Sequence, residues 1–526
     1  MSNGPTNKEV YHRLRALPWE KLWTEEVQRF TQASPRERFE NVSVIRAVGV
    51  VFPQSGPTEL RADVQLWLRE LLLDPEEKIR RYAIAALPKV GATGTDEAEL
   101  LKLLRTTKNP REEKFLGQAL DKIGGSATLE TLAASGKGSP QTIQKIQASL
   151  ARRETPSTVR LDHLLPESEA QRIHLRCRAG LEGILRAELE EQGKFRILGG
   201  ARGLVAITPL VPITLADIFA LRCFGTLGIV LGLVRTQQDT QSIESLAQII
   251  SSPATTRLLL ALTEGSLRYR LDFIGKGHQR SAVRLVANRA YALSQAILND
   301  PQEAPWAIDV HQNKSGDSVE LRPRTSPDPR HPYRLGDVPA ASHPPLAAAM
   351  ARLAGAQAQE RIWDPFCGSG LELIERSLQG GVESVFGTDR NAQAIAIAER
   401  NFAAATLPQI NAHFICSDFR DWEKIAGLTH QSISLIVTNP PLGRRVRVPH
   451  LRSLFHDLFC VAADVLRPGG RMVLTNPFQM DSPTDLLRLQ SRQVVDLGGF
   501  DCQLEVYEKA YPQTPDSQKQ SNAHPR

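Results

Sequence analysis

Residues 361–389 hold the pattern that most restricts the fold of this chain. "RIWDPFCGSG" is typical of a short apolar strand that ends at Asp364 and is followed by a glycine turn, "LELIERSLQGG" is typical of a helix, and "SVFGTD" is typical of a second strand that ends at Asp389. A strand, a Gly-rich turn, a helix and a second strand form one half of a doubly wound α/β fold. The pattern therefore predicts a Rossmann-like domain with a ligand site at the ends of these strands.

The glycine turn predicts a nucleoside ligand. Gly368 and Gly370 have no side chains that would keep a ligand from the backbone, and Asp389, 19 residues after Gly370, is placed to accept hydrogen bonds from ribose hydroxyls. Leu373 stands where the dinucleotide fingerprint has its third glycine, so the turn lacks one feature of a pyrophosphate-binding site. The turn alone is shared by nicotinamide, flavin and S-adenosylmethionine enzymes.

The next two strand ends narrow the chemistry. "AHFICSDF" predicts a strand that ends near Asp418, a side chain suited to an adenine amine, and "SISLIVTNPPL" predicts a strand that runs directly into Asn439, Pro440 and Pro441. The two prolines stiffen the loop and remove two backbone donors. The Asn439 side-chain carbonyl and the Pro440 backbone carbonyl remain as acceptors for one planar –NH2 group. These two acceptors predict methyl transfer to an amine.

The motifs resemble those of THUMP-containing class I S-adenosylmethionine-dependent RNA guanine-N2 methyltransferases. The similarity rests on Asp-Pro-Phe-Cys-Gly-Ser-Gly and Asn-Pro-Pro, and on the order of "CRAGLEGILRAELEEQG", "GGARGLVAIT", "LADIFALRCFGTLGIVL" and "HPYRLGDVPAASHPPLAAAMARLAG" before them. It covers about residues 172–510. The resemblance implies S-adenosyl-L-methionine as cofactor and structured RNA, tRNA or rRNA, as partner, with the target guanine flipped out of any duplex.

The resemblance also implies roles for individual residues. The cofactor-binding residues would be Asp364, Cys367, Gly368, Ser369, Gly370, Asp389, Asp418, Phe419 and Asn439. The residues at the target amine would be Asn439, Pro440, Pro441 and Leu442. The family usually has an aromatic residue at the position of Leu442, so we expect either that Phe478 or Tyr333 stacks on the base in its place or that base capture is weak.

Basic residues cluster where phosphate contacts would suit them. Seven Lys or Arg residues stand against two acidic ones between residues 257 and 289, in a chain with a net charge of +6. The residues assigned to RNA are Arg268, Arg270, Lys276, Arg280, Arg284, Arg444, Arg445 and Arg447. A solvated protein surface is the alternative interpretation of both groups.

The first 155 residues carry a weak repeat. "DPEEKIRRYAIAALPKVG" and "NPREEKFLGQALDKIG" each open with a turn, continue at helical spacing and end in Gly, and the Ala-Leu pair at 86–87 recurs 33 residues later. These units resemble HEAT-type helical repeats, which stack into a surface that binds other macromolecules. The pattern predicts a possible protein partner for this region, although an ordinary helical bundle is the alternative.

The expected chain is therefore multidomain. We predict α-helical HEAT-like repeats over 1–155, an α+β ferredoxin-like/THUMP-like RNA-binding module over 170–335, an α/β Rossmann-like methyltransferase domain over 340–510 and a polar tail over 511–526. The six cysteines have no zinc-type spacing, which predicts no metal site and free thiols in a cytoplasmic protein. The longest apolar run, 224–234, is about half of the ~20 residues that a membrane span needs.

Three function classes remain open at this point. The first is methylation of an exocyclic base amine in RNA, most simply guanine N2. The second is amine methylation of protein glutamine or DNA adenine, for which the same Asn-Pro-Pro tripeptide is suited. The third is a methyltransferase-like RNA-binding scaffold with weak or no catalysis. The THUMP-like segment and the basic clusters favour the first class over the second, and only activity separates the first from the third.

Overall fold

The computed structural model describes residues 7–91, 94–135, 140–154, 156–235, 239–275, 279–312, 316–339, 341–443, 449–480 and 482–511. Contacts divide the chain into two units, residues 1–159 with 233–317 and residues 160–232 with 318–526. The predicted tail beyond Tyr511 lies outside the described residues. The predicted domain boundaries remain predictions. In the described part, no helix is long and apolar enough to cross a bilayer.

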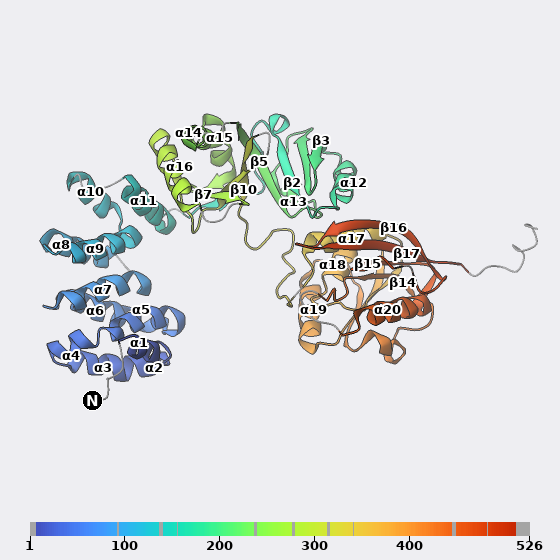
Figure 1. Cartoon of the computed structure of the whole chain (residues 1–526), viewed down its shortest axis with the longest axis horizontal. Coiled ribbons are helices and arrows are strands. Elements are labelled where there is room, and N and C mark those ends of the chain that lie inside the picture. The colour runs from blue at the N-terminus through green and yellow to red at the C-terminus, as the bar shows by residue number, and fades with distance from the viewer. Residues whose placement is uncertain are drawn as a thin grey trace, which may run out of the picture. The chain divides into compact units, whose positions relative to one another are not determined.

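Helices make up the N-terminal part of the first unit. They are α1 (Asn7–Arg15), α2 (Trp19–Lys21), η1 (Leu22–Val27), α3 (Gln28–Gln32), α4 (Pro35–Glu40), α5 (Ser43–Ser55), η2 (Thr58–Leu60), α6 (Arg61–Leu71), α7 (Glu77–Val90), α8 (Gly94–Thr106), α9 (Pro110–Ile123), α10 (Ser126–Ser135) and α11 (Pro140–Glu154). In one layer α5, α7, α9 and α11 pack in sequence, and α6, α8 and α10 lie against α7, α9 and α11 (Figure 1). The predicted helical region is confirmed.

The repeat of the sequence corresponds to α7 and α9. Both helices have 14 residues, and their bounds differ by the 33-residue offset that the sequence shows. Each follows a turn with a side-chain acceptor: Asp74 Oδ1 accepts from the Glu76 amide at 2.9 Å, and Asn109 Oδ1 accepts from the Arg111 amide at 2.9 Å. The two segments therefore begin in a similar way and occupy equivalent places in the layer.

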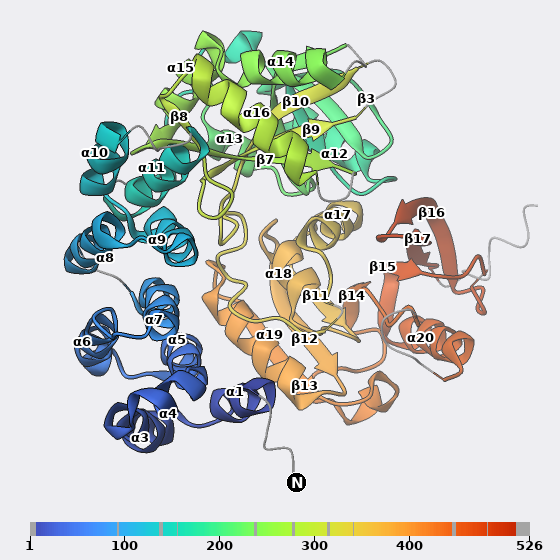
Figure 2. The same cartoon turned by 60° about the vertical axis from the view of Figure 1, so that its left-hand side comes forward.

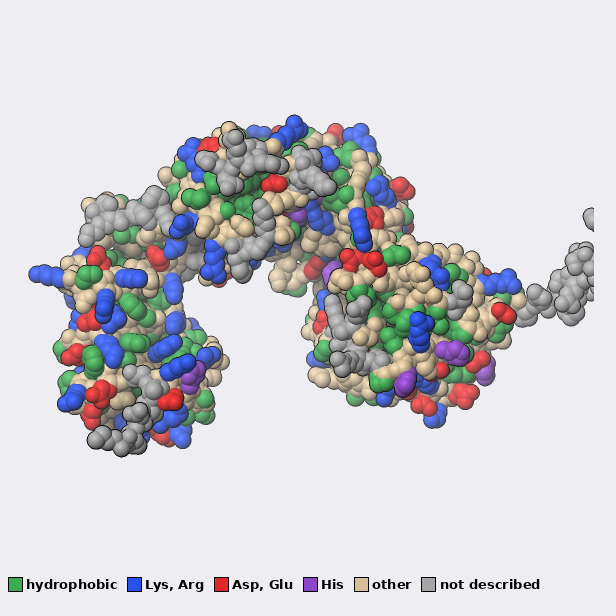
Figure 3. All heavy atoms as spheres, in the orientation of Figure 1, with side chains coloured by type: hydrophobic (Ala, Val, Ile, Leu, Met, Phe, Trp, Pro, Cys, Tyr) green, Lys and Arg blue, Asp and Glu red, His purple; other side chains and the backbone are tan. Residues whose placement is uncertain are grey.

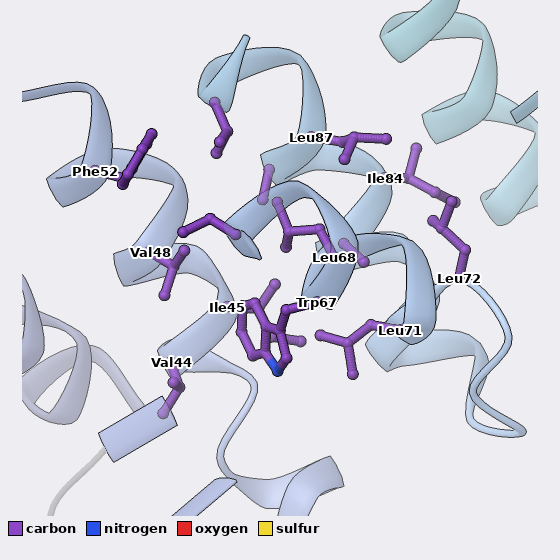
Figure 4. Close-up of a cluster of buried hydrophobic side chains, with 14 of the residues drawn as sticks. Val44, Ile45, Val48, Phe52, Trp67, Leu68, Leu71, Leu72, Ile84 and Leu87 are labelled. Atoms are coloured by element: carbon purple, nitrogen blue, oxygen red, sulfur yellow. The ribbon is translucent and has the colours of Figure 1, made fainter. Parts of the chain in front are cut away.

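The core of the helical region lies between the two layers. Figure 4 shows Val44, Ile45, Val48 and Phe52 of α5 together with side chains of α6 and α7, among them Trp67. The apolar residues recur at three- and four-residue spacing, which places them on one face of each helix. Burial of each large side chain contributes about 1.5–3 kcal/mol. This burial stabilises the packing of α5, α6 and α7 against one another.

The remainder of the first unit is α/β. Its elements are β1 (Thr158–Val159), α14 (Asp239–Ile250), α15 (Pro253–Leu262), β6 (Thr263–Glu264), β7 (Leu267–Ile274), α16 (Arg280–Leu293), β8 (Ile297–Asn299) and β9 (Trp306–His311). β7 pairs in parallel with both β8 and β9, and β1 pairs antiparallel with β6. The buried Trp306 indole donates to Thr263 Oγ1 at 2.9 Å, which ties β9 to β6.

The second unit begins with a mostly antiparallel sheet. Its elements are η3 (Ser168–Ala170), β2 (Ile173–Arg176), α12 (Glu182–Gln192), β3 (Phe195–Ala201), β4 (Leu204–Pro209), α13 (Leu215–Phe219), β5 (Thr226–Val234) and β10 (Asp317–Pro323), with strand order β3-β4-β2-β5-β10. The buried Glu320 of β10 contacts His174 Nδ1 at 2.7 Å and Arg176 Nη1 at 2.5 Å. These contacts hold β10 to β2 across β5.

The same unit contains the predicted Rossmann-like sheet. Its elements are α17 (Pro344–Ala354), β11 (Glu360–Asp364), α18 (Leu371–Ser377), β12 (Val382–Asp389), α19 (Ala392–Ala404), β13 (Asn411–Cys416), η4 (Phe419–Lys424), β14 (Ile433–Thr438), α20 (Leu451–Val465), β15 (Leu466–Asn476), β16 (Leu487–Asp496) and β17 (Asp501–Lys509). The order is β13-β12-β11-β14-β15-β17-β16, parallel from β13 to β15 (Figure 2). β17 and β16 complete the sheet as antiparallel strands.

Candidate active site

The strand order places the predicted site residues at one edge of the sheet. From β11 the chain adds strands in one direction to β12 and β13, and in the other direction to β14 and β15. Ligands of doubly wound sheets bind at such a point, beyond the carboxyl ends of the strands. Asp364 ends β11, Asp389 ends β12, and Asn439 directly follows β14. Thr438 Oγ1 donates to Asp364 Oδ1 at 2.6 Å, so the ends of β11 and β14 are in direct contact.

Two buried acids, Asp364 and Glu372, lie at this edge. Asp364 is fully buried, and while its Oδ1 also accepts from the Phe366 amide at 3.0 Å, its Oδ2 has no hydrogen-bond partner within the described residues. Burial raises the pKa of Asp364 well above its ordinary value, and the nearby charge of Glu372 raises it further. Burial likewise raises the pKa of Glu372 to about 6. A bound cation would satisfy the unpaired oxygen and favour the ionised acid.

The glycine turn has the conformation that the sequence predicts. Gly368 and Gly370 have φ of 51° and 83°, in the left-handed region that favours glycine. The Gly368 amide donates to Asp389 Oδ2 at 3.2 Å, and Asp389 Oδ1 accepts from the Asn391 amide at 2.9 Å. The end of β12 is thus tied to the turn that follows β11.

The side chains of the turn are buried. Burial raises the pKa of the Cys367 thiol well above its ordinary value, which keeps it a neutral thiol. Ser369 Oγ donates to Asp337 Oδ1 at 3.3 Å. These two residues shape the turn, and their predicted contact with a cofactor remains a prediction.

Asn401 of α19 holds a second loop against this turn. Its Nδ2 donates to the carbonyls of Ser369 at 2.9 Å and Gly336 at 3.0 Å, and its Oδ1 accepts from the amides of Leu335 at 3.0 Å and Gly336 at 3.1 Å. All of its side-chain donors and acceptors are used inside the protein. Sequence reasoning missed Asn401, because a single Asn within a helical pattern carries no motif.

The side chain of Asn439 is fixed from both ends. Its Nδ2 donates to Ser342 Oγ at 2.7 Å, and Ser342 Oγ in turn donates to Glu372. Its Oδ1 accepts from Thr475 Oγ1 at the end of β15. A carbonyl oxygen has two lone pairs, so Oδ1 keeps one acceptor position for a ligand amine. Ser342 and Thr475 are site residues that the sequence analysis did not identify.

Three apolar side chains follow the strand ends of this edge within four residues. Leu442, Phe366 and Phe478 are partly buried and pack against one hydrophobic cluster. The Phe478 ring meets Phe455 edge to face with centroids 5.6 Å apart, and the Arg452 guanidinium lies 4.6 Å from the Phe478 centroid. The other aromatic candidate is wrong: Tyr333 is buried and donates to Glu375, so it presents no ring to a flipped base.

The loop after β13 holds the predicted adenine-binding residues. Asp418 accepts from the Arg420 amide at 3.0 Å, and its carboxylate also lies 3.3 Å from the Arg420 guanidinium. Phe419 is buried, with its ring centroid 5.0 Å from that of Phe366. Both residues therefore lie near the site edge, and their role at an adenine stays a prediction.

The predicted RNA-binding residues divide into three groups. Arg270, Arg280 and Arg284 are exposed and line a groove of about 650 Å³ together with Lys145. Arg268 is 2% exposed and pairs with Asp300 at 3.1 Å, so its expected contact with RNA is wrong and its role is structural. The remaining four residues lie outside the described residues: Lys276, Arg444, Arg445 and Arg447.

Residues 331–497 match the family model of the RMKL-like methyltransferase domain, UPF0020. The matched segment contains β11 to β15 and therefore all of the strand ends described above. The prediction of a methyltransferase domain that uses S-adenosyl-L-methionine is confirmed for this segment. The match covers about a third of the chain and does not extend to the helical region.

Two curated relatives align with part of the chain. A tRNA (guanine(10)-N2)-dimethyltransferase of Methanothermobacter thermautotrophicus is 30% identical over 145 residues, which are 27% of this chain and 40% of the relative. A tRNA (guanine(6)-N2)-methyltransferase of Thermus thermophilus is 31% identical over 175 residues, which are 32% of this chain and 49% of the relative. The chain thus spans less than half the length of these relatives.

Solved structures also align over a larger part of the chain. TrmN from Thermus thermophilus has 20% sequence identity and a TM-score of 0.49, and the alignment covers 64% of this chain and 99% of that one. SMU.472 complexed with SAH has 14% identity and a TM-score of 0.48, with coverage of 65% and 99%.

The described residues fit S-adenosylmethionine. The cofactor carries a cationic ammonium and a cationic sulfonium, and the unpaired, buried Asp364 Oδ2 offers an acceptor for a positive group. Gly368 and Gly370 adopt the left-handed conformation, and a Cβ at Gly370 would lie 3.3 Å from Ala398 of α19, so glycine lets the turn pack closely against that helix. Asp389 is partly exposed at the next strand end, which is the expected place for a ribose partner.

Proposed function

We propose that this protein is an S-adenosylmethionine-dependent RNA methyltransferase that modifies the exocyclic N2 amine of a guanine in tRNA. The observation that carries the proposal is the fixed amide of Asn439, which lies one residue beyond the Thr438 contact to Asp364. Both curated relatives are named as tRNA guanine-N2 methyltransferases, which supports the choice of base and RNA.

The residues of the chain have distinct tasks in this proposal. When bound, the cofactor supplies an activated methyl group. Asp364, Gly368 and Asp389 hold it at the sheet edge, with Cys367, Ser369 and Gly370 forming the turn and Asp418 and Phe419 at the adenine end. An exocyclic amine is a poor nucleophile because its lone pair is shared with the ring. Acceptors for its N–H groups favour the charge that develops on nitrogen.

Asn439 and Pro440 supply these acceptors. The free lone pair of Asn439 Oδ1 accepts one N–H of the target amine and the Pro440 carbonyl accepts the other. Ser342 and Thr475 keep the Asn439 amide in one orientation, so no reorganisation is needed when the base arrives. Leu442 and Phe478 provide apolar contacts for a base that is flipped out of the helix.

The other regions bring the RNA to this site. We assign residues 170–335 to a THUMP-like RNA-binding module, in which Arg270, Arg280 and Arg284 contact phosphates. We assign residues 1–155 to HEAT-like repeats, which the equivalent placement of α7 and α9 supports.

Analysis of methylated nucleosides tests the proposal. Full-length protein is incubated with methyl-labelled S-adenosylmethionine and unmodified tRNA, and the digested nucleosides are identified by mass spectrometry. The expected product is N2-methylguanosine, formed at a rate ~10²–10³ lower with Asn439→Ala. Label in N6-methyladenosine, or in DNA or protein glutamine when DNA or protein replaces the tRNA, would contradict the assignment. Absence of any labelled product would favour a non-catalytic scaffold.

A further inference from the structure

The two layers of the helical region differ in charge. Helices α5, α7, α9 and α11 contain eleven Lys or Arg residues and five Asp or Glu residues. Helices α6, α8 and α10 contain four Lys or Arg residues and six Asp or Glu residues. Both layers share one apolar core, so solubility or packing alone does not require this separation. The layer of α5, α7, α9 and α11 is therefore the more basic of the two.

Each helix of the basic layer exposes at least one cation. We single out Arg46 on α5, Lys89 on α7, Lys122 on α9 and Lys145 on α11; α9 also exposes Arg111 and Lys114. Packed neighbouring helices lie about 8–10 Å apart, so four helices spread the cations over roughly 30 Å. Figure 3 shows many Lys and Arg side chains on the surface of the helical region. We call these four residues the basic row.

The first members of the row are close enough to repel one another. Partial desolvation lowers the pKa of the Lys89 ammonium, and the positive charges of Lys122 and Arg46 lower it further. Arg46 and Lys89 also line one groove of about 230 Å³, with the half-buried rings of Tyr82 and Phe115 in its wall. Within the described residues, neither Arg46 nor Lys89 has a carboxylate partner. An anionic ligand would relieve this repulsion.

The guanidinium groups of the groove are held by aromatic rings. The Arg46 guanidinium lies 3.9 Å from the Tyr11 centroid, and that of Arg81 lies 5.4 Å from the Phe115 centroid. Arg81 also pairs with Glu77 at 2.5 Å. A stacked guanidinium loses less conformational entropy when it binds a phosphate, because its orientation is already limited.

The last member of the row leads to the groove already assigned to RNA. Lys145 pairs with Asp121 of α9 at 3.2 Å. It also lines the 650 Å³ groove with Arg270, Arg280 and Arg284, and all of these residues belong to the same unit. The row therefore extends a basic groove of the α/β part along the helical layer.

We propose that the basic row binds the phosphate backbone of the RNA substrate. The placement of exposed cations on successive helices suits a polyanion with repeated charges, and contacts of this kind add affinity without base specificity. Continuity with the Arg270 groove favours RNA over an acidic protein. The choice of RNA rests on the proposed function, whereas the presence of a polyanion-binding face rests only on the charges and contacts of the helical region.

Fluorescence anisotropy with labelled tRNA tests this proposal. The double variant Arg46→Gln/Lys89→Gln removes the two unpaired cations of the row. The matched control Arg105→Gln/Lys102→Gln removes one Arg and one Lys from exposed positions of α8, in the other layer. Circular dichroism and thermal unfolding of the full-length proteins establish that both variants are folded.

We expect the row variant to raise the Kd for tRNA by about tenfold at 150 mM salt. The slope of log Kd against log salt concentration should fall by roughly two, one for each lost phosphate contact. The control should change the Kd less than twofold. Equal Kd values and slopes for the folded row variant and wild type would overturn the proposal.

Two further outcomes separate this proposal from the proposed function. If wild type forms no N2-methylguanosine but the row variant still loses tRNA affinity, the basic row stands and the proposed function fails. If wild type methylates guanine and the row variant binds tRNA as wild type does, the proposed function stands and the basic row fails. Tighter binding of duplex DNA than of tRNA through the same row would contradict the assignment to RNA.

Discussion

Asp364→Asn separates the stability of the site from its affinity for the cofactor. Asparagine has nearly the same shape, and its carbonyl can still accept from Thr438 and from the Phe366 amide. The substitution replaces a carboxyl group whose ionisation is disfavoured by burial and by the charge of Glu372. The free protein should therefore be as stable as wild type or slightly more stable, because no charged hydrogen bond of the free state is lost.

Cofactor affinity should change in the opposite direction. A hydrogen bond to a charged group contributes about 1.5–3 kcal/mol, which corresponds to roughly a tenfold to 150-fold loss of affinity. A cation bound at Asp364 favours its ionised form, so binding to wild type should release a proton and weaken as the pH falls. Asp364→Asn should lose this part of the pH dependence.

Calorimetry of full-length protein with S-adenosylmethionine, at pH 6 and pH 8, measures the affinity and the protons released. Thermal unfolding of the free proteins measures the stability. Wild-type affinity in Asp364→Asn, at both pH values, would refute the assignment of Asp364 to a cationic group of the cofactor. A large loss of thermal stability would instead show that the carboxylate serves the fold.

Three further variants test other contacts of the site. Ser342→Ala should lower single-turnover methylation about tenfold with unchanged cofactor affinity, since it frees the Asn439 amide to rotate; full activity would contradict that positioning role. In the folded protein the pKa of Glu372 is about 6, compared with its ordinary 4.5, so the folded state binds this proton more tightly than the unfolded state does. The free energy of unfolding of wild type should therefore fall by ~2 kcal/mol as the pH rises from below 4.5 to above 6. Urea unfolding of Glu372→Gln should show this loss removed, and an unchanged pH dependence would exclude Glu372 as its source. Phe478→Ala should lower methylation at least tenfold while Leu442→Tyr leaves it unchanged; a silent Phe478→Ala would contradict stacking by Phe478.

The features that the sequence predicts well are local. The glycine turn needs positive φ at Gly368 and Gly370, and the strands around it are short apolar runs, so both are visible within one window of the chain. Asn439 is recognisable because a strand that runs into two prolines is unusual. The helical repeat is visible because α7 and α9 use equivalent positions for the same layer.

The features that the sequence does not predict depend on long-range contacts. Ser342 and Thr475 lie 97 and 36 residues from Asn439, and nothing in their own neighbourhoods marks them as its partners. Arg268 stands in a basic cluster, but the parallel pairing of β7 and β8 brings it beside Asp300 and buries it. Net charge over a window does not distinguish an exposed arginine from one that completes a core.

The central claim is that Asn439 orients a guanine amine for methylation. The most direct measurement is single-turnover formation of N2-methylguanosine in tRNA by wild type and Asn439→Ala, with S-adenosylmethionine and tRNA affinities measured in parallel. We predict N2-methylguanosine with wild type, and a rate ~10²–10³ lower with Asn439→Ala while both affinities are retained. Equal rates for the two proteins, or a product other than N2-methylguanosine with wild type, would contradict the claim.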